Sequence, residues 1–193
     1  MKKAILLSLV ILGGLTAALP ASAKACSRPS VAGSDKVIVP GKRINEALLD
    51  AAVRVEVNYY RCRAGLRPVR SEPRLRKIAK GHSKWMARAR NMSHHSTVSG
   101  RRTFGDRIKA SGIRWKAAAE NIGMVYRFRM EQKLFFSEAG ATCQFTNSAG
   151  QRIPPHSYKS LANYVVKLWM NSPGHRKNIL DRRMTMVGTA VAL

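Results

Sequence analysis

Apolar and polar residues recur at helical spacing over several stretches of the chain, and most of these stretches carry a start or stop signal. The first apolar stripe runs down one face of a long helix and comprises Ile44, Leu48, Ala51, Ala52, Val55 and Tyr59. Gly65 is placed to end this helix, and Pro68 forbids its continuation. We therefore expect a helix that begins near Arg43 and stops at Gly65.

Three further helices are predicted from the same kind of pattern. The second opens at Ser71-Glu72-Pro73 with Ser71 as its N-cap, and its buried face comprises Leu75, Ile78, Ala79, His82 and Met86. A short third helix runs from Phe104 to Ser111 and is closed by Gly112. Ser157 caps the fourth, whose apolar stripe comprises Leu161, Tyr164, Val165, Leu168 and Trp169.

The stretch Ser172-Pro173-Gly174-His175 predicts one more short helix directly after the fourth. Ser172 is a good N-cap, and Pro173 fits the first helical position, where a missing N–H has no consequence. His175 then falls in the first turn, near the positive end of the helix dipole. A charged imidazole is disfavoured there, so the ring is biased towards its neutral form, which can act as a ligand.

Two segments have the character of strands. Met124 to Phe128 shows mixed alternation of apolar and polar residues, and Met186 to Leu193 forms a closing strand rich in β-branched residues. Between them, residues 129–156 predict a hairpin-like or irregular excursion that holds Cys143. Helices and strands that alternate around one core predict a single layered α+β domain over residues 43–193.

The N-terminus has the form of a secretory signal. Met1-Lys2-Lys3 precedes an apolar run from Ala4 to Leu19, and Ala21-Ser22-Ala23 supplies the small residues for cleavage after Ala23. Residues 1–23 are therefore predicted to be a signal peptide, and the protein to be secreted or periplasmic, with a retained membrane anchor as the alternative. No second apolar stretch is long enough to span a bilayer, so we expect no transmembrane segment in the mature chain. Residues 24–42 have little apolar periodicity and predict an exposed leader.

The charge balance is strongly basic. The chain has 35 Lys and Arg against 10 Asp and Glu, a formal net charge of +25. Such a charge favours anionic partners, of which an anionic envelope, lipid or glycan surface and non-specifically bound nucleic acid are the candidates. No signature of a nucleic-acid-binding module accompanies the cations, which are spread along the chain. A solvated basic surface without a dedicated ligand is the alternative interpretation.

All three cysteines follow the predicted cleavage point, in a compartment that permits disulfides. Three cysteines allow one bridge and leave one thiol over. We prefer the pair Cys62 and Cys143, because Cys26 lies in the predicted leader. Spacing alone does not establish that pairing. The chain has no CxxC motif, so neither a redox motif nor a zinc ribbon is supported.

Five motifs in order resemble the CAP superfamily, which contains cysteine-rich secretory proteins, venom antigens and plant pathogenesis-related proteins. The matching pieces are Asn58-x-x-Arg61-x-x-x-Gly65-Leu66-x-Pro68-Val69, Leu75-x-x-x-Ala79-x-x-His82-Ser83-x-x-Met86-Ala87, Met92-Ser93-His94, Ala119-Glu120-Asn121-Ile122, and Trp169-Met170-x-Ser172-Pro173-Gly174-His175-Arg176-x-Asn178-Ile179-Leu180. The last piece runs into Val187-Gly188. The resemblance covers roughly residues 44–191 and is to the compact bacterial form of the family.

The resemblance implies a three-layer α-β-α sandwich with a central cleft, here with a shortened C-terminal sheet. By position, the cleft residues of the family correspond to His94, Glu120 and His175, which in some members bind a divalent metal such as zinc. The fourth, acidic member of animal relatives would fall near Ser172 and is absent. Two imidazoles and a carboxylate suit Zn²⁺ with an open position for water, and such a site can support hydrolysis. The same three residues can instead form a hydrogen-bonded structural cluster.

We favour a secreted binding module for an extracellular or envelope ligand, with an anionic partner preferred, over a zinc-dependent hydrolase that uses the same cluster. The sequence shows no activated nucleophile, so it does not decide whether the protein is an enzyme. His95 is the alternative to His94 in the cluster. The other side chains have simpler interpretations: His82 as a packed core residue, His156 as an exposed one, and Trp85, Trp115 and Trp169 as core.

Overall fold

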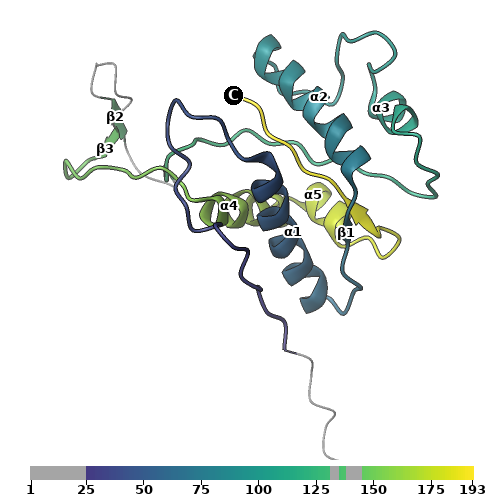
Figure 1. The fold of residues 1–193 in the computed structure, drawn as a ribbon, viewed down its shortest axis with the longest axis horizontal. Helices are drawn as coiled ribbons and strands as arrows, with labels where there is room; N and C mark the ends of the chain where they lie inside the picture. Colours follow the sequence, from purple (N-terminus) through teal and green to yellow (C-terminus); the bar gives the residue numbers. More distant parts are fainter. Residues whose placement is uncertain (1–24, 131–134, 138–144) are drawn as a thin grey trace, which may run out of the picture.

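The chain folds into two helical layers with its own C-terminal segment between them (Figure 1). The computed structural model describes residues 25–130, 135–137 and 145–193. In chain order the elements are α1 (Glu46–Arg63), β1 (Arg70–Ser71), α2 (Pro73–Ala89), α3 (Phe104–Ala110), β2 (Phe135–Ser137), β3 (Phe145–Asn147), α4 (Tyr158–Asn171), α5 (Pro173–Ile179) and β4 (Met186–Val187). Within the described residues, no helix combines the length and apolar character that crossing a bilayer requires.

The helix ends follow the local chemistry of the sequence. The Asn45 side chain accepts a hydrogen bond from the Leu48 backbone N–H and begins α1, slightly later than the predicted start near Arg43. Gly65 follows the end of α1 with a φ of +69°, a left-handed conformation that favours glycine, so the predicted stop is confirmed. Ser157 forms a reciprocal capping box with Ser160 at the start of α4, as a capping residue should.

One cap prediction is wrong by a residue. Glu72, not Ser71, caps α2 by accepting from the Arg74 backbone N–H. Ser71 belongs to β1 instead, and its hydroxyl donates to the buried Asp50 carboxylate at 3.0 Å. The strand pairing takes Ser71 out of the capping position.

The first layer packs α1 against α4. Leu49, Val53 and Val57 come from α1, at the spacing of one helix face, and they share a buried cluster with the α4 side chains Leu161, Ala162 and Val166. Ile179 of α5 adds to the same cluster. Burial of apolar area at about 25 cal/mol per Å² makes this layer the main source of folding free energy.

The middle layer consists of the C-terminal segment and a very short parallel ladder. β1 pairs with β4, with Arg70 opposite Met186 and Ser71 opposite Val187. After β4 the chain stays between the layers: the Thr189 backbone N–H donates to Asp50 of α1, and the Ala190 carbonyl accepts from Ser83 of α2. The predicted strand over Met186 to Leu193 is therefore a two-residue ladder followed by a segment held by side chains.

Gly188 shows how closely this segment approaches α2. A Cβ on Gly188 would lie 2.2 Å from the Arg76 backbone nitrogen and 2.6 Å from the Leu75 carbonyl carbon. Because both are backbone atoms, they cannot rotate away, and only glycine fits. The Val187-Gly188 step thus sets the distance between the C-terminal segment and the second layer, which contains α2 and α3.

A buried guanidinium ties α1 to the irregular chain that leads into β4. Arg61 is 1% exposed, and its three nitrogens donate to the carbonyl oxygens of Arg67, Ile179, Asp181 and Met184 at 2.7 to 2.9 Å. These carbonyls lie in turns that lack strand partners, so the arginine supplies the donors that a wider sheet would supply. The structure is thus an α+β fold with a short sheet.

Two predictions in the region of residues 124–156 are corrected by the structure. Met124 to Phe128 is not a strand: Met124 and Tyr126 are 84% and 67% exposed, and a single bridge joins Phe128 to Pro155. Among the described residues, its backbone pairing is limited to the hydrogen bonds of Arg127 and Arg129 with His156 and Pro154, too few for a strand. The hairpin-like excursion is present as the antiparallel pair β2 and β3. His156 is fully buried, stacks on Tyr164 and has Ser160 Oγ at 2.9 Å, so the expectation of an exposed ring is wrong.

The preferred disulfide is also wrong. Cys26 bonds to Cys62, near the C-terminal end of α1, and closes a loop of sequence separation 36. Cys143 lies outside the described residues. The leader is therefore fastened to the domain: the Arg28 guanidinium donates to the buried Glu56 carboxylate at 2.8 Å, and Ile38 is 2% exposed in the core. Most other residues of this segment are exposed.

Peptide mapping under non-reducing conditions should recover Cys26 linked to Cys62. Replacing both by serine should lower the free energy of unfolding by about 4 kcal/mol, because the open chain regains the entropy of a loop of this length. Urea unfolding measures the change. Cys143→Ser is the matched control and should leave the midpoint unchanged. A recovered Cys62–Cys143 peptide would contradict the structure.

Candidate functional site

Glu120 is the centre of the cluster that the sequence pointed to. Its Oε1 lies 2.9 Å from Nδ1 of His94, so two of the three predicted residues are brought together. Arg107 joins them: its Nη2 donates to both carboxylate oxygens, at 2.6 and 2.9 Å. A second imidazole is also close, because His82 Nε2 lies 4.0 Å from Glu120 Oε1. The carboxylate thus has one full positive charge and two imidazoles around it.

The short helix α3 positions Arg107. Thr103 and Asp106 form a capping box that fixes the start of α3, which turns Arg107 inwards, where it is 2% exposed. Its guanidinium also donates to the carbonyl oxygens of His94, Arg101 and Arg102. Arg107 therefore holds the loop between α2 and α3 closed, and Glu120 supplies the counter-charge for this buried cation.

His82 is a packed core residue, as predicted, and also faces this cluster. It is 4% exposed, stacks on Trp85, and its Nε2 donates to the Ser93 carbonyl at 2.8 Å. That bond leaves the buried Nδ1 bare, without a partner among the described residues. Burial lowers the pKa of His82 below 6.5, and the charge of Arg107 lowers it further, against the opposite effect of Glu120. The ring is therefore neutral at neutral pH.

His175 is placed beside the cluster by its backbone. Asn121 donates to the His175 carbonyl at 3.1 Å, and Asn178 donates to the Asn121 side-chain oxygen at 2.8 Å. No hydrogen bond or ion pair joins the His175 imidazole to another described residue. Ser172 stands at the N-cap of α5, as predicted, although its side chain makes no capping bond. The motif that contains Glu120 and the motif that contains His175 therefore contact each other through Asn121 and Asn178.

This arrangement does not fit a zinc ion. Within the described ranges, no three His, Cys, Asp or Glu side chains are grouped so that they could hold a metal. The Arg107 guanidinium pairs with the Glu120 carboxylate at 2.6 Å, and its positive charge repels a second cation at the same site. His94 and Glu120 alone leave too few ligands for a tetrahedral site. The contacts instead describe an ion-paired network that orders the chain between α2, α3 and Glu120.

A cavity of about 560 Å³ separates the two layers above the short ladder. Its walls are largely apolar, with Val53 and Leu161 on one side and Ile78 and Met86 on the other, and Glu120 is among the lining residues. His82 lines it as well, whereas His94 and His175 do not. The two predicted histidines therefore lie next to the cavity, since His94 contacts Glu120 and the His175 backbone contacts Asn121, and both Glu120 and Asn121 line it.

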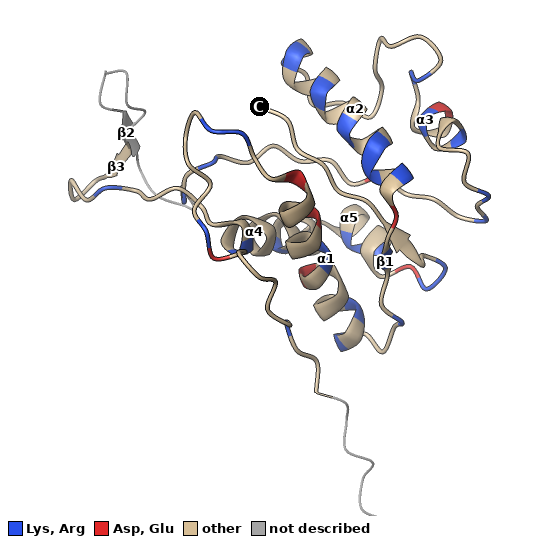
Figure 2. Ribbon diagram, viewed as in Figure 1, with Lys and Arg blue, Asp and Glu red and all other residues tan. Residues whose placement is uncertain are grey.

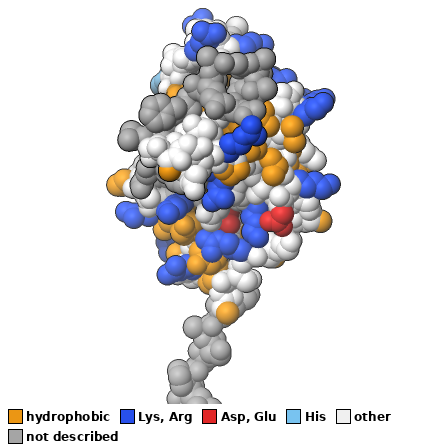
Figure 3. All heavy atoms as spheres, turned by 90° about the vertical axis from the view of Figure 1, so that its left-hand side faces the viewer, with side chains coloured by type: hydrophobic (Ala, Val, Ile, Leu, Met, Phe, Trp, Pro, Cys, Tyr) orange, Lys and Arg blue, Asp and Glu red, His pale blue; other side chains and the backbone are white. Residues whose placement is uncertain are grey.

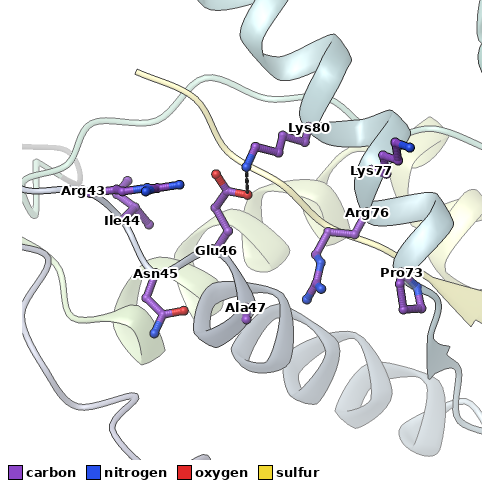
Figure 4. Close-up of a pocket in the computed structure, with 9 residues that line it drawn as sticks. All are labelled: Arg43, Ile44, Asn45, Glu46, Ala47, Pro73, Arg76, Lys77 and Lys80. Atoms are coloured by element: carbon purple, nitrogen blue, oxygen red, sulfur yellow. Dashed lines mark ion pairs between the residues drawn. The ribbon is translucent and has the colours of Figure 1, made fainter.

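A second hollow, of about 630 Å³, lies between the start of α1 and the start of α2 (Figure 4). Arg43, Arg76, Lys77 and Lys80 line it, together with a single acid, Glu46. Figure 4 shows the Arg43, Arg76 and Lys80 side chains in the space between the two helices, with Lys77 on the outer side of α2. Lys80 and Glu46 pair at 3.0 Å. We call this hollow the basic groove.

A family model described as the cysteine-rich secretory protein family, CAP, matches residues 55–193. The chain belongs to this family. The uncharacterized protein YkwD of Bacillus subtilis is 31% identical over 131 residues, which are 68% of this chain and 37% of that relative. The chain thus spans well under half of the relative's length. The crystal structure of an extracellular protein containing an SCP domain, from Bacillus anthracis, superposes with a TM-score of 0.53 at 22% identity, over 79% of this chain and 41% of that one.

The structure adds residues that the motifs of the CAP domain did not point to. Arg107 lies in a short helix without a diagnostic pattern, and its role depends on Glu120, 13 residues away in the chain. Lys80 lies within a run of cations that the sequence shows only as scattered charge. Its spacing from Lys77 and Lys84 by three and four residues would have placed these cations on one helix face.

Acidification should destabilise the protein through His82. The unfolded ring takes up a proton as the pH falls below about 6.5, whereas the folded ring, with its lowered pKa, resists protonation. Stability is therefore full above pH 6.5 and falls towards the folded pKa, by at most about 1.4 kcal/mol per pH unit. Urea unfolding from pH 7 to pH 5 should show a steeper loss for the wild type than for His82→Gln. Parallel curves would contradict this assignment.

Glu120→Gln should lower the free energy of unfolding by about 3 kcal/mol, because it leaves the buried Arg107 guanidinium without a counter-charge. Thermal and urea unfolding measure the loss. Asp35→Asn is the matched control, since the Asp35–Lys159 pair is exposed and its removal should change stability by less than about 1 kcal/mol. Equal effects of the two substitutions would remove the structural role given to Glu120.

Proposed function

We propose that this CAP-domain protein is a secreted binding module that engages an anionic extracellular or envelope component through the basic groove. The observation that carries the proposal is the convergence of Arg43, Arg76, Lys77 and Lys80 on one hollow with a single acid. Four cations at the wall of a concave site attract an anion more strongly than the same charges on a convex surface, because low-dielectric walls focus the field.

The location of the groove supports binding rather than a purely structural role for these cations. Arg76 comes from α2 and Arg43 from the segment before α1, so two elements distant in sequence place like charges on the wall of one hollow. These cations repel one another when no anion is bound between them. The positive end of the α1 dipole also opens towards the groove at Asn45, and Glu46 offsets part of that potential.

Export of the protein is supported by its N-terminal residues. Met1-Lys2-Lys3, the apolar run to Leu19 and the small residues up to Ala23 have the form of a cleaved signal peptide. The disulfide between Cys26 and Cys62 belongs to an oxidising compartment. The Bacillus anthracis relative in fold is described as extracellular. A secreted or periplasmic location agrees with these features.

Calorimetry with inorganic tripolyphosphate as the probe tests the groove. Arg43→Gln with Arg76→Gln should weaken binding by about thirtyfold, since each of the two lost charge contacts contributes on the order of 1 kcal/mol. Lys167→Gln with Arg182→Gln is the control of equal charge change, taken from exposed positions elsewhere. Affinity should also fall as salt rises from about 50 to about 200 mM. Equal binding by both double variants would overturn the proposal.

Glu46→Gln should have the opposite effect on the affinity for tripolyphosphate. The substitution removes the acid of the groove and frees Lys80, so tripolyphosphate should bind more tightly, by about threefold to tenfold. Both directions together exclude a simple loss of fold, which cannot strengthen binding. Weaker binding by Glu46→Gln would contradict the assignment of the site to this hollow.

A further inference from the structure

The helix α2 carries six cations over 17 residues and no acidic residue. Four of them fall on one face, at spacings of three, four and four residues: Lys77, Lys80, Lys84 and Arg88. Figure 2 shows these cations recurring along the length of α2. At 1.5 Å rise per residue, they form a row about 17 Å long that begins at the basic groove. We call this row the α2 stripe.

Among the described residues, Lys80 is the one member of the α2 stripe that pairs with a carboxylate, Glu46 at 3.0 Å. Lys77, Lys84 and Arg88 are exposed, and none of them pairs with a carboxylate of the described residues. Lys80 with Lys84, and Lys84 with Arg88, are like-charged neighbours four residues apart, which lowers the stability of a helix. Sequences usually intersperse Glu on such a face, and α2 has none. The charges therefore repel one another until an external anion lies along them.

A fifth cation joins the row from outside the helix. Gly81 lies beside the stripe and has no side chain, and the Arg101 guanidinium from the loop before α3 occupies the space next to it: a Cβ on Gly81 would lie 4.0 Å from Arg101 Nη1. Arg101 is itself exposed. Two separate chain segments thus add charge to the same line.

Figure 3 shows another face, the one at the left of Figure 1, where Lys and Arg side chains are interspersed with hydrophobic and uncharged ones. A row differs from a scatter in what it can bind, because successive charges at about 6 Å intervals match a linear chain of anions rather than a single ion.

We propose that the α2 stripe continues the basic groove into a binding track for a linear phosphate polymer, recognised by charge spacing alone. This inference rests on the proposed anion-binding function of the groove. Lys80 lies in both features and joins them. One end of the polymer lies in the groove near Arg76, and successive phosphates contact Lys77, Lys84 and Arg88.

A membrane surface and a stacked nucleic acid fit the stripe less well. The exposed positions of α2 are Pro73, Arg74, Lys77, Gly81, Lys84, Arg88 and Ala89, so no large apolar side chain stands beside the cations to enter a bilayer. The same positions include no aromatic residue on which a base could stack. The stripe therefore fits a linear polyanion that is contacted through its charges alone, and we assign it to a phosphate polymer.

Chain length is the variable that tests the track. Long-chain inorganic polyphosphate should bind the wild type at least tenfold more tightly per molecule than pyrophosphate, which is too short to leave the groove. Lys84→Gln with Arg88→Gln should remove most of that gain and leave pyrophosphate binding unchanged. It should also reduce the slope of log affinity against log salt by about 1.4, since each lost phosphate contact removes about 0.7.

Lys167→Gln with Arg182→Gln serves again as the control and should keep the length dependence. If long-chain polyphosphate binds no more tightly than pyrophosphate, the track is wrong while the groove stands. If neither phosphate binds at low salt, the groove fails together with the track. Stronger, length-independent binding to vesicles of anionic lipid, lost in the Lys84 and Arg88 variant, would overturn the track in favour of a membrane surface. Circular dichroism confirms that each variant is folded.

Discussion

The buried guanidinium of Arg61 is the constraint on which the arrangement of the two layers depends. The β1–β4 ladder contains two residue pairs, too few to position a middle layer by backbone hydrogen bonding. Arg61 donates instead to four carbonyls that come from the turn after α1, the end of α5 and the approach to β4. Because buried carbonyls need donors, removal of this side chain would leave them unsatisfied. The path into β4, and with it the C-terminal segment, follows from this one residue.

Arg107 has the same part in the second layer, and this changes the role to be given to Glu120. Glu120 resembles a metal ligand by its position in a motif, yet its oxygens receive the Arg107 guanidinium, which in turn holds three loop carbonyls. A carboxylate that already accepts two hydrogen bonds from a buried guanidinium is a poorer metal ligand, because that cation repels a second one. In both layers, therefore, arginine side chains supply the donors that a broader sheet would supply, and the polar cluster beside the cleft is part of that support.

The charge of the protein is separable from this framework. The buried guanidinium groups of Arg61 and Arg107 donate to carbonyls and to Glu120, and only Nε of Arg107 lacks a partner among the described residues. The cations of the basic groove and the α2 stripe instead line a hollow or are exposed, and Glu46 pairs with one of them, Lys80. An all-cationic helix surface contributes nothing to packing and opposes it slightly through repulsion. The net positive charge explains attraction to anions in general. The alignment of cations on α2 adds a spacing that favours a linear anion.

Helix starts and stops could be predicted from the sequence because they depend on neighbours in the chain: Ser157 caps α4 and Gly65 ends α1 by local backbone chemistry. The α+β class and the approach of His94 to Glu120 were also within reach, through motifs. The Cys26–Cys62 bond, the burial of His156, the irregular course of Met124 to Phe128 and the pairing of Arg107 with Glu120 were not. Each depends on which distant segments meet, and that is decided only when the layers pack.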